Sequence, residues 1–129
     1  MPNHTRNELV VCGKEKDVDH FLKHMGEEND GLDFNQIIPM PEDVEDSMGD
    51  PGITPLWRDW SCENWGTKWN AYDIEKDIFT TGDIKTVTYN FLTAWSPPEP
   101  IIEKLKKDWS DLVFYGGYVE EGYQSCGAF

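Results

Sequence analysis

The sequence predicts an α+β fold built on one antiparallel sheet, and three observations lead to this prediction. Short apolar runs typical of strands alternate with two amphipathic stretches typical of helices. Their order is strand, helix and strand, then a long polar segment, then strand, strand, helix and strand. The chain has 129 residues, of which 38% are hydrophobic and 13% aromatic, enough for one domain with a ring-rich core. Two crossover helices on one sheet predict a ferredoxin-like split βαβ sandwich with both helices on one face.

The first half of the chain contains the first strand, the first helix and a second short strand. Residues 8–12 (ELVVC) form the first apolar run. Residues 14–25 follow with apolar positions at i, i+3, i+4 and i+7, and Gly26 stands where a helix commonly ends. Residues 34–40 (FNQIIPM) predict a strand that Pro39 confines to an edge or an end of the sheet.

The second half contains two further strands before the second helix. Residues 68–74 can form an extended segment, and residues 84–95 alternate most clearly. One face of the second strand is predicted to carry Val87, Tyr89, Phe91 and Trp95.

The second helix and the closing strand follow at the C-terminal end. In "SPPEPIIEKL", Ser96 is predicted to cap the helix and Glu99 to complete a capping box. Residues 112–119 predict the closing strand, in which Gly116 and Gly117 indicate a β-bulge.

The negative charge is concentrated in one segment. The chain carries 25 acidic residues against 11 Lys and Arg, for a net charge of −14. Residues 27–63 hold eleven of these acids and a single base, Arg58, together with several prolines and glycines. This composition breaks regular structure. We therefore expect one domain over residues 1–129, with a long, irregular acidic insertion at about 41–63.

Composition excludes several classes of protein. A net charge of −14 argues against a protein that follows nucleic-acid phosphates. The last strand offers the rings of "FYGGY" without the basic residues that RNA-binding strands use. Three cysteines without a C-x-x-C pair favour reduced thiols, and no segment has the length of a membrane span. We expect a soluble, cytoplasmic protein that binds neither nucleic acid directly nor a membrane.

Catalytic and metal-binding patterns are weak. His20 and His24 are spaced to share a helix face, but no H-E-x-x-H motif surrounds them. The run "PEDVEDSMGDPG" lacks the ligand order of an EF-hand loop. Cys126 has no histidine close in sequence, and no phosphate-binding loop or G-x-S-x-G is present. We predict no catalytic residue, no metal and no cofactor.

Four sequence blocks carry a family resemblance. They are "FNQIIPMPEDV" (34–44), "ENWGTKWNAYD" (63–73), "FLTAWSPPEPIIEKL" (91–105) and "YVEEGYQSCG" (118–127). In this order they resemble the YubB ferredoxin-like family of phage, plasmid and other mobile-element proteins. The resemblance implies a ferredoxin-like fold and an origin in a mobile element, and it implies no particular chemistry.

The block "NWGTKWNAYD" (64–73) has two interpretations. In the architectural one, Trp65, Trp69 and Trp95 meet around the sheet, Gly66 makes a tight turn, and Lys68 and Asn70 face outward. In the alternative, exposed tryptophans anchor a partner, as rings often do at interfaces. The architectural interpretation is the stronger prediction.

Together these features give a hypothesis for function. The protein is expected to be a non-enzymatic phage or mobile-element protein that binds and inhibits a bacterial defence complex, as an anti-CRISPR does. Its acidic surface would occupy a basic nucleic-acid-binding groove of a protein partner in the bacterial cytoplasm. The predicted partner-binding residues are Glu42, Asp43, Glu45, Asp46 and Asp50, as phosphate stand-ins, with Trp57 and Trp60 as apolar anchors.

Two alternatives come from other classes. The protein could be a structural or assembly protein of the mobile element that self-associates through its aromatic surface; its oligomeric state is open. It could also be a small enzyme that uses Cys126, His20 or His24.

Overall fold

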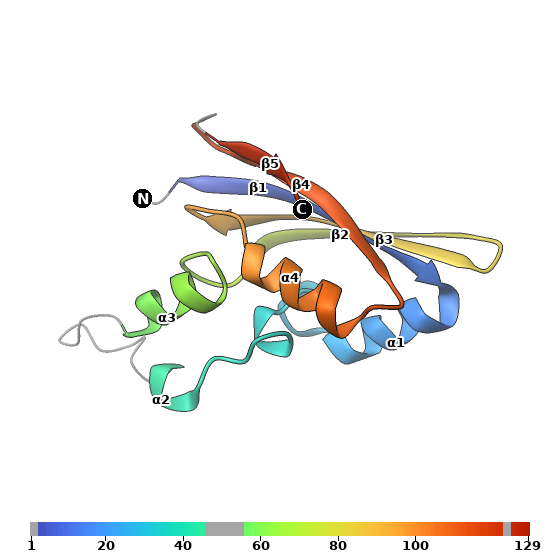
Figure 1. Cartoon of the computed structure of the whole chain (residues 1–129), viewed down its shortest axis with the longest axis horizontal. Coiled ribbons are helices and arrows are strands. Elements are labelled where there is room, and N and C mark those ends of the chain that lie inside the picture. Colours follow the sequence, from blue (N-terminus) through green and yellow to red (C-terminus); the bar gives the residue numbers. More distant parts are fainter. Residues whose placement is uncertain (1–2, 46–55, 123–124) are drawn as a thin grey trace.

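The computed structural model describes residues 3–45, 56–122 and 125–129. Its five strands form one antiparallel sheet in the order β2-β3-β1-β4-β5 (Figure 1). The strands are β1 (His4–Lys14), β2 (Tyr72–Thr81), β3 (Ile84–Ala94), β4 (Val113–Glu120) and β5 (Cys126–Ala128). The helices are α1 (Glu15–Met25), α2 (Glu42–Glu45), α3 (Leu56–Asn64) and α4 (Glu99–Asp108), with 3-10 turns η1 (Glu28–Gly31) and η2 (Phe34–Gln36). The predicted α+β, ferredoxin-like class is confirmed.

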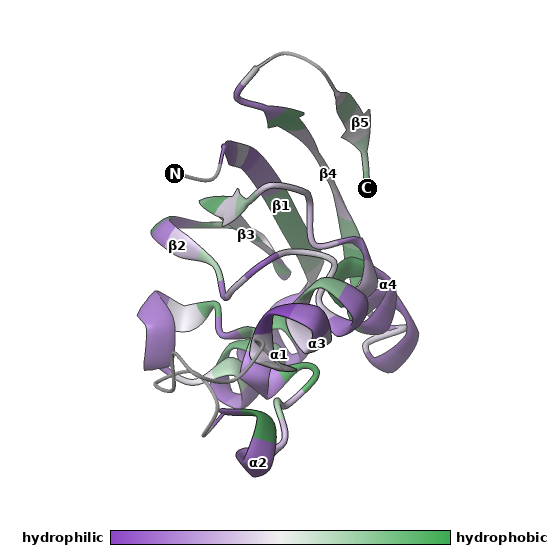
Figure 2. Ribbon diagram, turned by 90° about the vertical axis from the view of Figure 1, so that its left-hand side faces the viewer, coloured by the Kyte–Doolittle hydropathy of each residue, from purple (hydrophilic) through white to green (hydrophobic). Residues whose placement is uncertain are grey.

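Two split βαβ units build this sheet. The first runs from β1 through α1 to β2, and the second from β3 through α4 to β4. The central pair, β1 and β3, is in continuous register from His4 opposite Ala94 to Lys14 opposite Ile84. In Figure 2, α1, α3 and α4 lie on the same side of the sheet, and α2 lies farthest from it.

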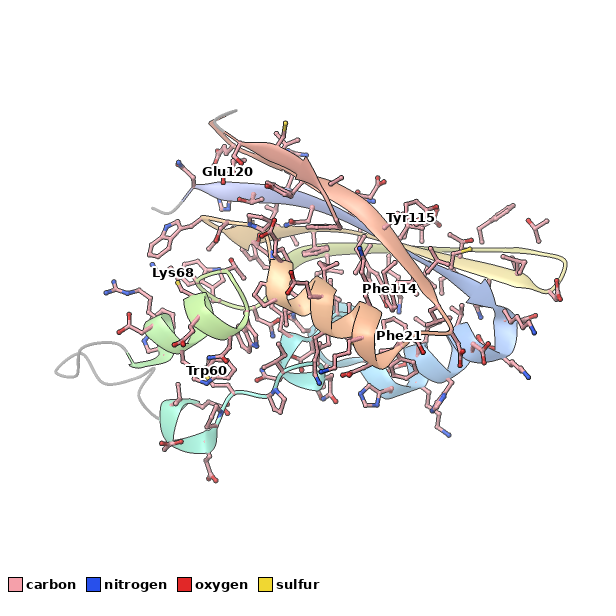
Figure 3. The ribbon with its side chains drawn as sticks, viewed as in Figure 1. Phe21, Trp60, Lys68, Phe114, Tyr115 and Glu120 are labelled. Carbon is pink, nitrogen blue, oxygen red and sulfur yellow. The ribbon has the colours of Figure 1, made fainter. Side chains whose placement is uncertain are left out.

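The core lies between the sheet and the helices because the strand residues alternate between two faces. Leu9 and Val11 of β1 are fully buried on the helix side. Phe21 of α1 meets Phe114 of β4 edge to face, with ring centroids 5.6 Å apart. Figure 3 shows these two rings below β4 and Tyr115 above it. The opposite face of the sheet therefore carries no helix among the described residues.

The predicted strand at residues 34–40 is wrong, since the chain forms η2 there instead. Its backbone N–H groups are bound by side chains and by local turns. Asp33 Oδ1 accepts from the N–H of Asn35 at 2.9 Å, and Asn70 Oδ1 accepts from the N–H of Phe34 at 3.0 Å. Hydrogen bonds of this kind compete with a strand ladder, and a single sequence does not show that Asn70 arrives from elsewhere.

The strand predicted at residues 68–74 begins later and runs longer. β2 starts at Tyr72, where the register against β3 shifts before Glu75, and Asp73 has φ +49°. From Glu75 to Thr81 the pairing with β3 is regular. β5 was not predicted, because its three residues are too few to show alternation.

The acidic insertion is not irregular throughout. Its described parts contain α2 and α3, and α3 is attached to the core through Trp60, whose ring meets Trp65 at 5.3 Å. Apolar residues at helical spacing therefore override the breaking effect of the surrounding prolines in α3.

Two local predictions in the C-terminal half are also wrong. α4 begins at Glu99 after Pro98, and Ser96 Oγ donates to the carbonyl of Gly66 at 2.5 Å instead of capping the helix. The register of β4 with β1 is continuous through Gly116, so there is no bulge. Gly116 is needed because a Cβ there would lie 1.9 Å from the carbonyl oxygen of Glu8, at a φ of +146°.

Candidate interaction site

The chain between α3 and β2 is the structural centre of the candidate site. After α3 the N–H groups of Trp65 and Gly66 both donate to the carbonyl of Ser61, which closes the helix. Gly66 has φ +78°, and a Cβ there would lie 2.5 Å from Cδ of Pro100. The buried Thr67 then donates through Oγ1 to Ala94 O at 2.7 Å. The predicted tight turn at Gly66 is confirmed, and it holds the loop against β3 and α4.

Trp65 is an architectural residue. Its side chain is only 2% exposed, and its Nε1–H donates to the carbonyl of Ile38 at 2.8 Å. Its ring meets Phe34 and Trp60 edge to face, at centroid distances of 5.7 and 5.3 Å. A buried indole with a satisfied N–H is a strong core contact. The architectural interpretation of this block is confirmed for Trp65.

Asn70 was expected to face outward, and this expectation is wrong. Its Oδ1 accepts from the N–H groups of Phe34 and Ala71, and its Nδ2 donates to Asp33 Oδ1 at 2.9 Å. Asp33 is itself buried. One of the eleven acids of residues 27–63 is therefore a structural hydrogen-bond acceptor that joins η2 to the loop before β2.

Trp95 does not share the buried face of β3. It is 41% exposed with φ +77°, whereas Val87, Tyr89 and Phe91 are buried. Lys68 Nζ lies 4.5 Å from the ring centroid of Trp95 and 4.7 Å from that of Trp69. These are cation–π distances. Lys68 is thus held between two rings, and the backbone turns at Trp95 to bring one of them there.

A pocket of about 250 Å³ opens between α2, α3 and this loop. We call it the tryptophan pocket. Its described lining residues are Asn35, Met40, Glu45, Trp57, Ser61, Trp65, Trp69 and Asn70. Three indole rings thus contribute to its walls, and Glu45 is the one charged residue among those named. Because the lining comes from four separate segments (η2 with the residues after it, α2, α3 and the loop before β2), sequence spacing gave no sign of it.

Of the predicted partner-binding acids, three lie where the structure describes them. Glu42, Asp43 and Glu45 form α2 and are all exposed. In the described ranges, ion pairs join Lys85 to Asp19 and Lys104 to Asp108, and none involves an acid of α2. The other two predicted acids, Asp46 and Asp50, lie outside the described residues.

The two predicted tryptophan anchors differ. Trp57 is half-buried and lines the tryptophan pocket. Trp60 is also half-buried, but its ring packs on Trp65 and on the core cluster. Figure 3 places Trp60 and Lys68 on opposite sides of α3. Sequence reasoning did not include Trp69, the third ring of the pocket, among the partner-binding residues.

The open face of the sheet carries exposed apolar side chains that the sequence analysis did not assign to a binding site. Phe79 of β2 is 67% exposed, and Val113 and Tyr115 of β4 are 59% and 51% exposed. The signal was available, since Val113 and Tyr115 alternate with the buried Leu112 and Phe114. At one end of this face a shallow hollow is lined by Arg6, Glu8, Glu75, Asn90, Gly117 and Cys126, among others.

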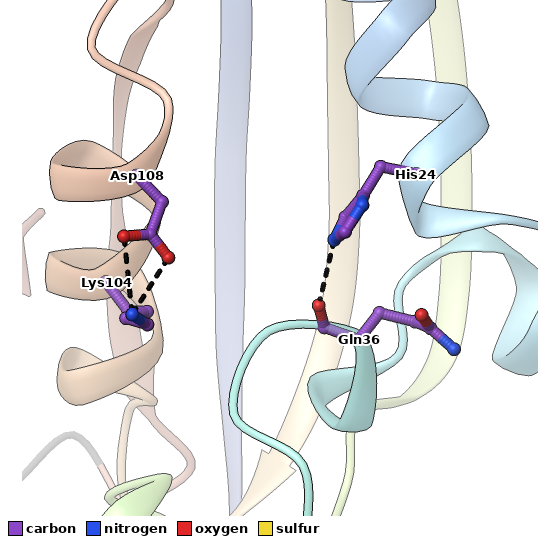
Figure 4. Close-up of polar contacts among 4 residues, drawn as sticks. All are labelled: His24, Gln36, Lys104 and Asp108. Carbon is purple, nitrogen blue, oxygen red and sulfur yellow. Dashed lines mark hydrogen bonds and ion pairs between the residues drawn. The ribbon is translucent and has the colours of Figure 1, made fainter.

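The histidines of α1 pack on a ring. His20 and His24 each meet Trp109 at a centroid distance of 5.3 Å. A ring nitrogen of His24 also lies 3.2 Å from the carbonyl oxygen of Gln36 (Figure 4). Figure 4 also draws the Lys104–Asp108 pair, one turn apart on α4. These contacts give both histidines a packing role.

The cysteines are dispersed. Cys126 is exposed on β5, at the sheet edge, while His20 and His24 lie on α1 beneath the sheet. Burial, opposed in part by the charge of Arg58, raises the pKa of the Cys62 thiol. Across residues 3–45, 56–122 and 125–129, no three His, Cys, Asp or Glu side chains gather closely enough to hold a metal ion.

The fold and the loop around Trp65 define the class of this protein, a ferredoxin-like α+β domain with two crossover helices on one face. The family described as "Ferredoxin-like domain in Api92-like protein" matches residues 64–129, and the chain belongs to that family. Comparison with curated proteins and with solved structures gave no significant match. None of the described helices has the length and apolarity needed to cross a bilayer.

Proposed function

We propose that this protein is a non-enzymatic binding protein of a phage or another mobile element, and that it inhibits a bacterial defence complex in the host cytoplasm. This origin is supported by the resemblance to YubB-type proteins of mobile elements. The resemblance lies in the four blocks at 34–44, 63–73, 91–105 and 118–127. In this proposal the acidic surface covers a basic groove in which the defence complex binds nucleic acid.

One observation carries the proposal. The acids of α2 are exposed and take part in no ion pair within the described part of the chain. They stand on the helix farthest from the sheet (Figure 2). Carboxylates that the protein does not neutralise itself produce a negative field, which steers a basic partner toward this surface.

The test compares two variants with the same change in charge. The first, Glu42→Gln/Asp43→Asn/Glu45→Gln, removes the acids of α2. The second, Glu15→Gln/Glu103→Gln/Asp111→Asn, removes three exposed acids elsewhere. Each is measured against nuclease-treated, purified CRISPR effector complexes at salt concentrations from about 50 to 500 mM, with effector nucleic acid as competitor.

We expect nucleic acid to displace the wild-type protein, and binding to weaken as salt rises. The α2 variant should bind at least about tenfold more weakly, with a flatter salt dependence, because buried or closely matched charges contribute most at interfaces. Equal binding by the two variants would contradict the proposal, as would binding that nucleic acid does not displace.

Self-association is a second candidate, which the exposed Phe79, Val113 and Tyr115 favour. An apolar face of this kind is typical of an interaction surface. Sedimentation velocity at micromolar concentration tests it. A dimer that the Tyr115→Glu variant converts to monomer would support an assembly role, and a monomer for the wild-type protein would exclude it.

A further inference from the structure

The tryptophan pocket combines rings with one carboxylate. Trp57, Trp65 and Trp69 contribute to its walls, and Glu45 lies at its α2 side. At about 250 Å³ it is smaller than the pockets of roughly 300–1,000 Å³ that hold drug-sized ligands. Its volume suits one long side chain of a partner rather than a cofactor.

Most polar groups of the pocket are already engaged within the protein. Ser61 Oγ donates to Trp57 O at 2.7 Å, and Trp65 Nε1 donates to Ile38 O at 2.8 Å. The side-chain oxygen and nitrogen of Asn70 are bound as described above. The described lining therefore offers a ligand mainly ring surface, and its one charged group is the carboxylate of Glu45. An occupant with a flat or elongated apolar body and a positive charge matches this lining.

We propose that the tryptophan pocket binds one arginine side chain of the protein partner. This inference rests on the proposed binding function and names the contact that would anchor it. A guanidinium group is planar, weakly hydrated and suited both to ring stacking and to paired hydrogen bonds with a carboxylate. The ammonium group of lysine is more strongly hydrated and lacks the planar face.

The protein's own chain shows that one ring of the pocket, Trp69, accepts a cation. Lys68 Nζ sits 4.7 Å from the ring centroid of Trp69. Lys68 in this loop and Arg58 on α3 are positive charges that oppose an incoming arginine. The three carboxylates of α2 outnumber them, and Glu45 alone among these charged groups lines the pocket.

The first test uses small peptides and the indole N–H signals of the labelled full-length protein in NMR. A short neutral peptide with one arginine is compared with the same peptide carrying lysine or citrulline, which keeps the shape of arginine without its charge. We expect the arginine peptide to shift the Trp57 and Trp69 signals in a saturable way and to leave Trp109 unchanged. The lysine and citrulline peptides should bind at least about fivefold more weakly.

Two variants on the same helix sharpen this test. Glu45→Gln keeps the size of the side chain and should weaken arginine-peptide binding about three- to tenfold. Glu42→Gln makes the same charge change one turn earlier, at a residue that is not among those lining the pocket, and should change binding less than about twofold. Equal effects of the two variants, or equal binding of the citrulline or lysine peptide, would overturn the inference.

The outcome separates this inference from the function on which it rests. If the arginine peptide fails to bind while the triple α2 variant still loses the partner, the pocket assignment is wrong and the acidic surface stands. If the peptide binds as expected but nucleic acid does not compete with the protein for the effector, the pocket stands and the proposed inhibition is wrong.

Discussion

Two parts of the same acidic segment are used in opposite ways. Around η2, Asp33 is buried and accepts hydrogen bonds from the backbone of Asn35 and the side chain of Asn70. On α2, Glu42 and Glu45 are exposed and have no ion-pair partner in the part of the chain that is described. A count of charges treats these carboxylates alike. Burial separates a carboxylate that holds the fold from carboxylates that are available to a partner.

The stretch around η2 is also attached to the core by rings, whereas the acids of α2 are exposed. Trp65 packs on Phe34 of η2 and binds the carbonyl of Ile38 just beyond it. On α2, Glu42, Asp43 and Glu45 are exposed and Val44 is half-buried. We therefore expect mutations near η2 to affect stability, and mutations on α2 to affect recognition.

The largest expected effect comes from breaking the ring contact that anchors η2. Trp65→Ala should lower the free energy of unfolding by about 3–5 kcal/mol, because a buried indole leaves a large cavity. Urea denaturation measures this change. Trp95→Ala is the control, since that ring is 41% exposed, and it should cost less than about 1.5 kcal/mol. Equal losses for the two variants would contradict the distinction between the buried and exposed rings.

Removing the buried carboxylate tests the comparison directly. Asp33→Ala leaves Nδ2 of Asn70 and the N–H of Asn35 without their acceptor, so we expect a loss of about 3 kcal/mol. Thermal and urea unfolding of the variant give the value. The matched change Asp43→Ala on α2 should alter stability by less than about 0.5 kcal/mol. A similar loss at both positions would show that Asp33 has no special structural role.

Burial also predicts how stability depends on pH. Burial raises the pKa of Tyr89 to about 12, from a usual value of 10.0. Below pH 10 both the folded and the unfolded protein keep the phenol proton of Tyr89. Between pH 10 and about 12 the unfolded protein alone releases it, so the free energy of unfolding falls as pH rises. The loss is about 2 kcal/mol over this interval.

Urea unfolding of the wild-type protein at several alkaline pH values measures this slope, and Tyr89→Phe is the control. The control should lose the Tyr89 part of the slope and keep the part due to Tyr72. The pKa of Tyr72 is raised as well, by burial and then by the charges of Asp73 and Glu121. Identical slopes in both proteins would refute the assignment to Tyr89.

The smallest expected effect is at the proposed recognition surface. Glu42→Gln/Asp43→Asn/Glu45→Gln should change the free energy of unfolding by less than about 0.5 kcal/mol, because exposed charges without partners contribute little to stability. Circular dichroism during thermal unfolding measures this change. A loss well above that size would mean that α2 supports the fold, and binding data from this variant would then need another explanation.

The secondary-structure predictions succeeded where the apolar residues are regularly spaced. β3 was found because its apolar residues alternate over many positions, and α1 because its apolar residues repeat at helical spacing. The strand predicted at 34–40 failed because Asn70, 36 positions away, binds the backbone of Phe34. The capping role predicted for Ser96 failed for the same kind of reason. Its hydroxyl donates to the carbonyl of Gly66, which lies in another part of the chain.

The partner-binding role of the predicted site residues stays a prediction, and the structure shows only where the described ones lie. Glu42, Asp43 and Glu45 were chosen from charge density alone, and all three are exposed. Trp57 was chosen as an anchor and lines the tryptophan pocket, but Trp60 packs against the core. Trp69 was placed in the architecture, because nothing local distinguishes a ring that lines a pocket from one that fills a core.

The sequence by itself determined the α+β class, the central strands, both crossover helices and the location of the negative charge. These properties depend on residues close together in the chain, where alternation, helical spacing and composition act. Only the tertiary structure decided that Asp33 is a buried acceptor, that Trp95 turns outward, and that three tryptophans line one pocket with Glu45. Each of these depends on which distant segments come into contact, and the burial that results decides whether a side chain stabilises the fold or is available to a partner.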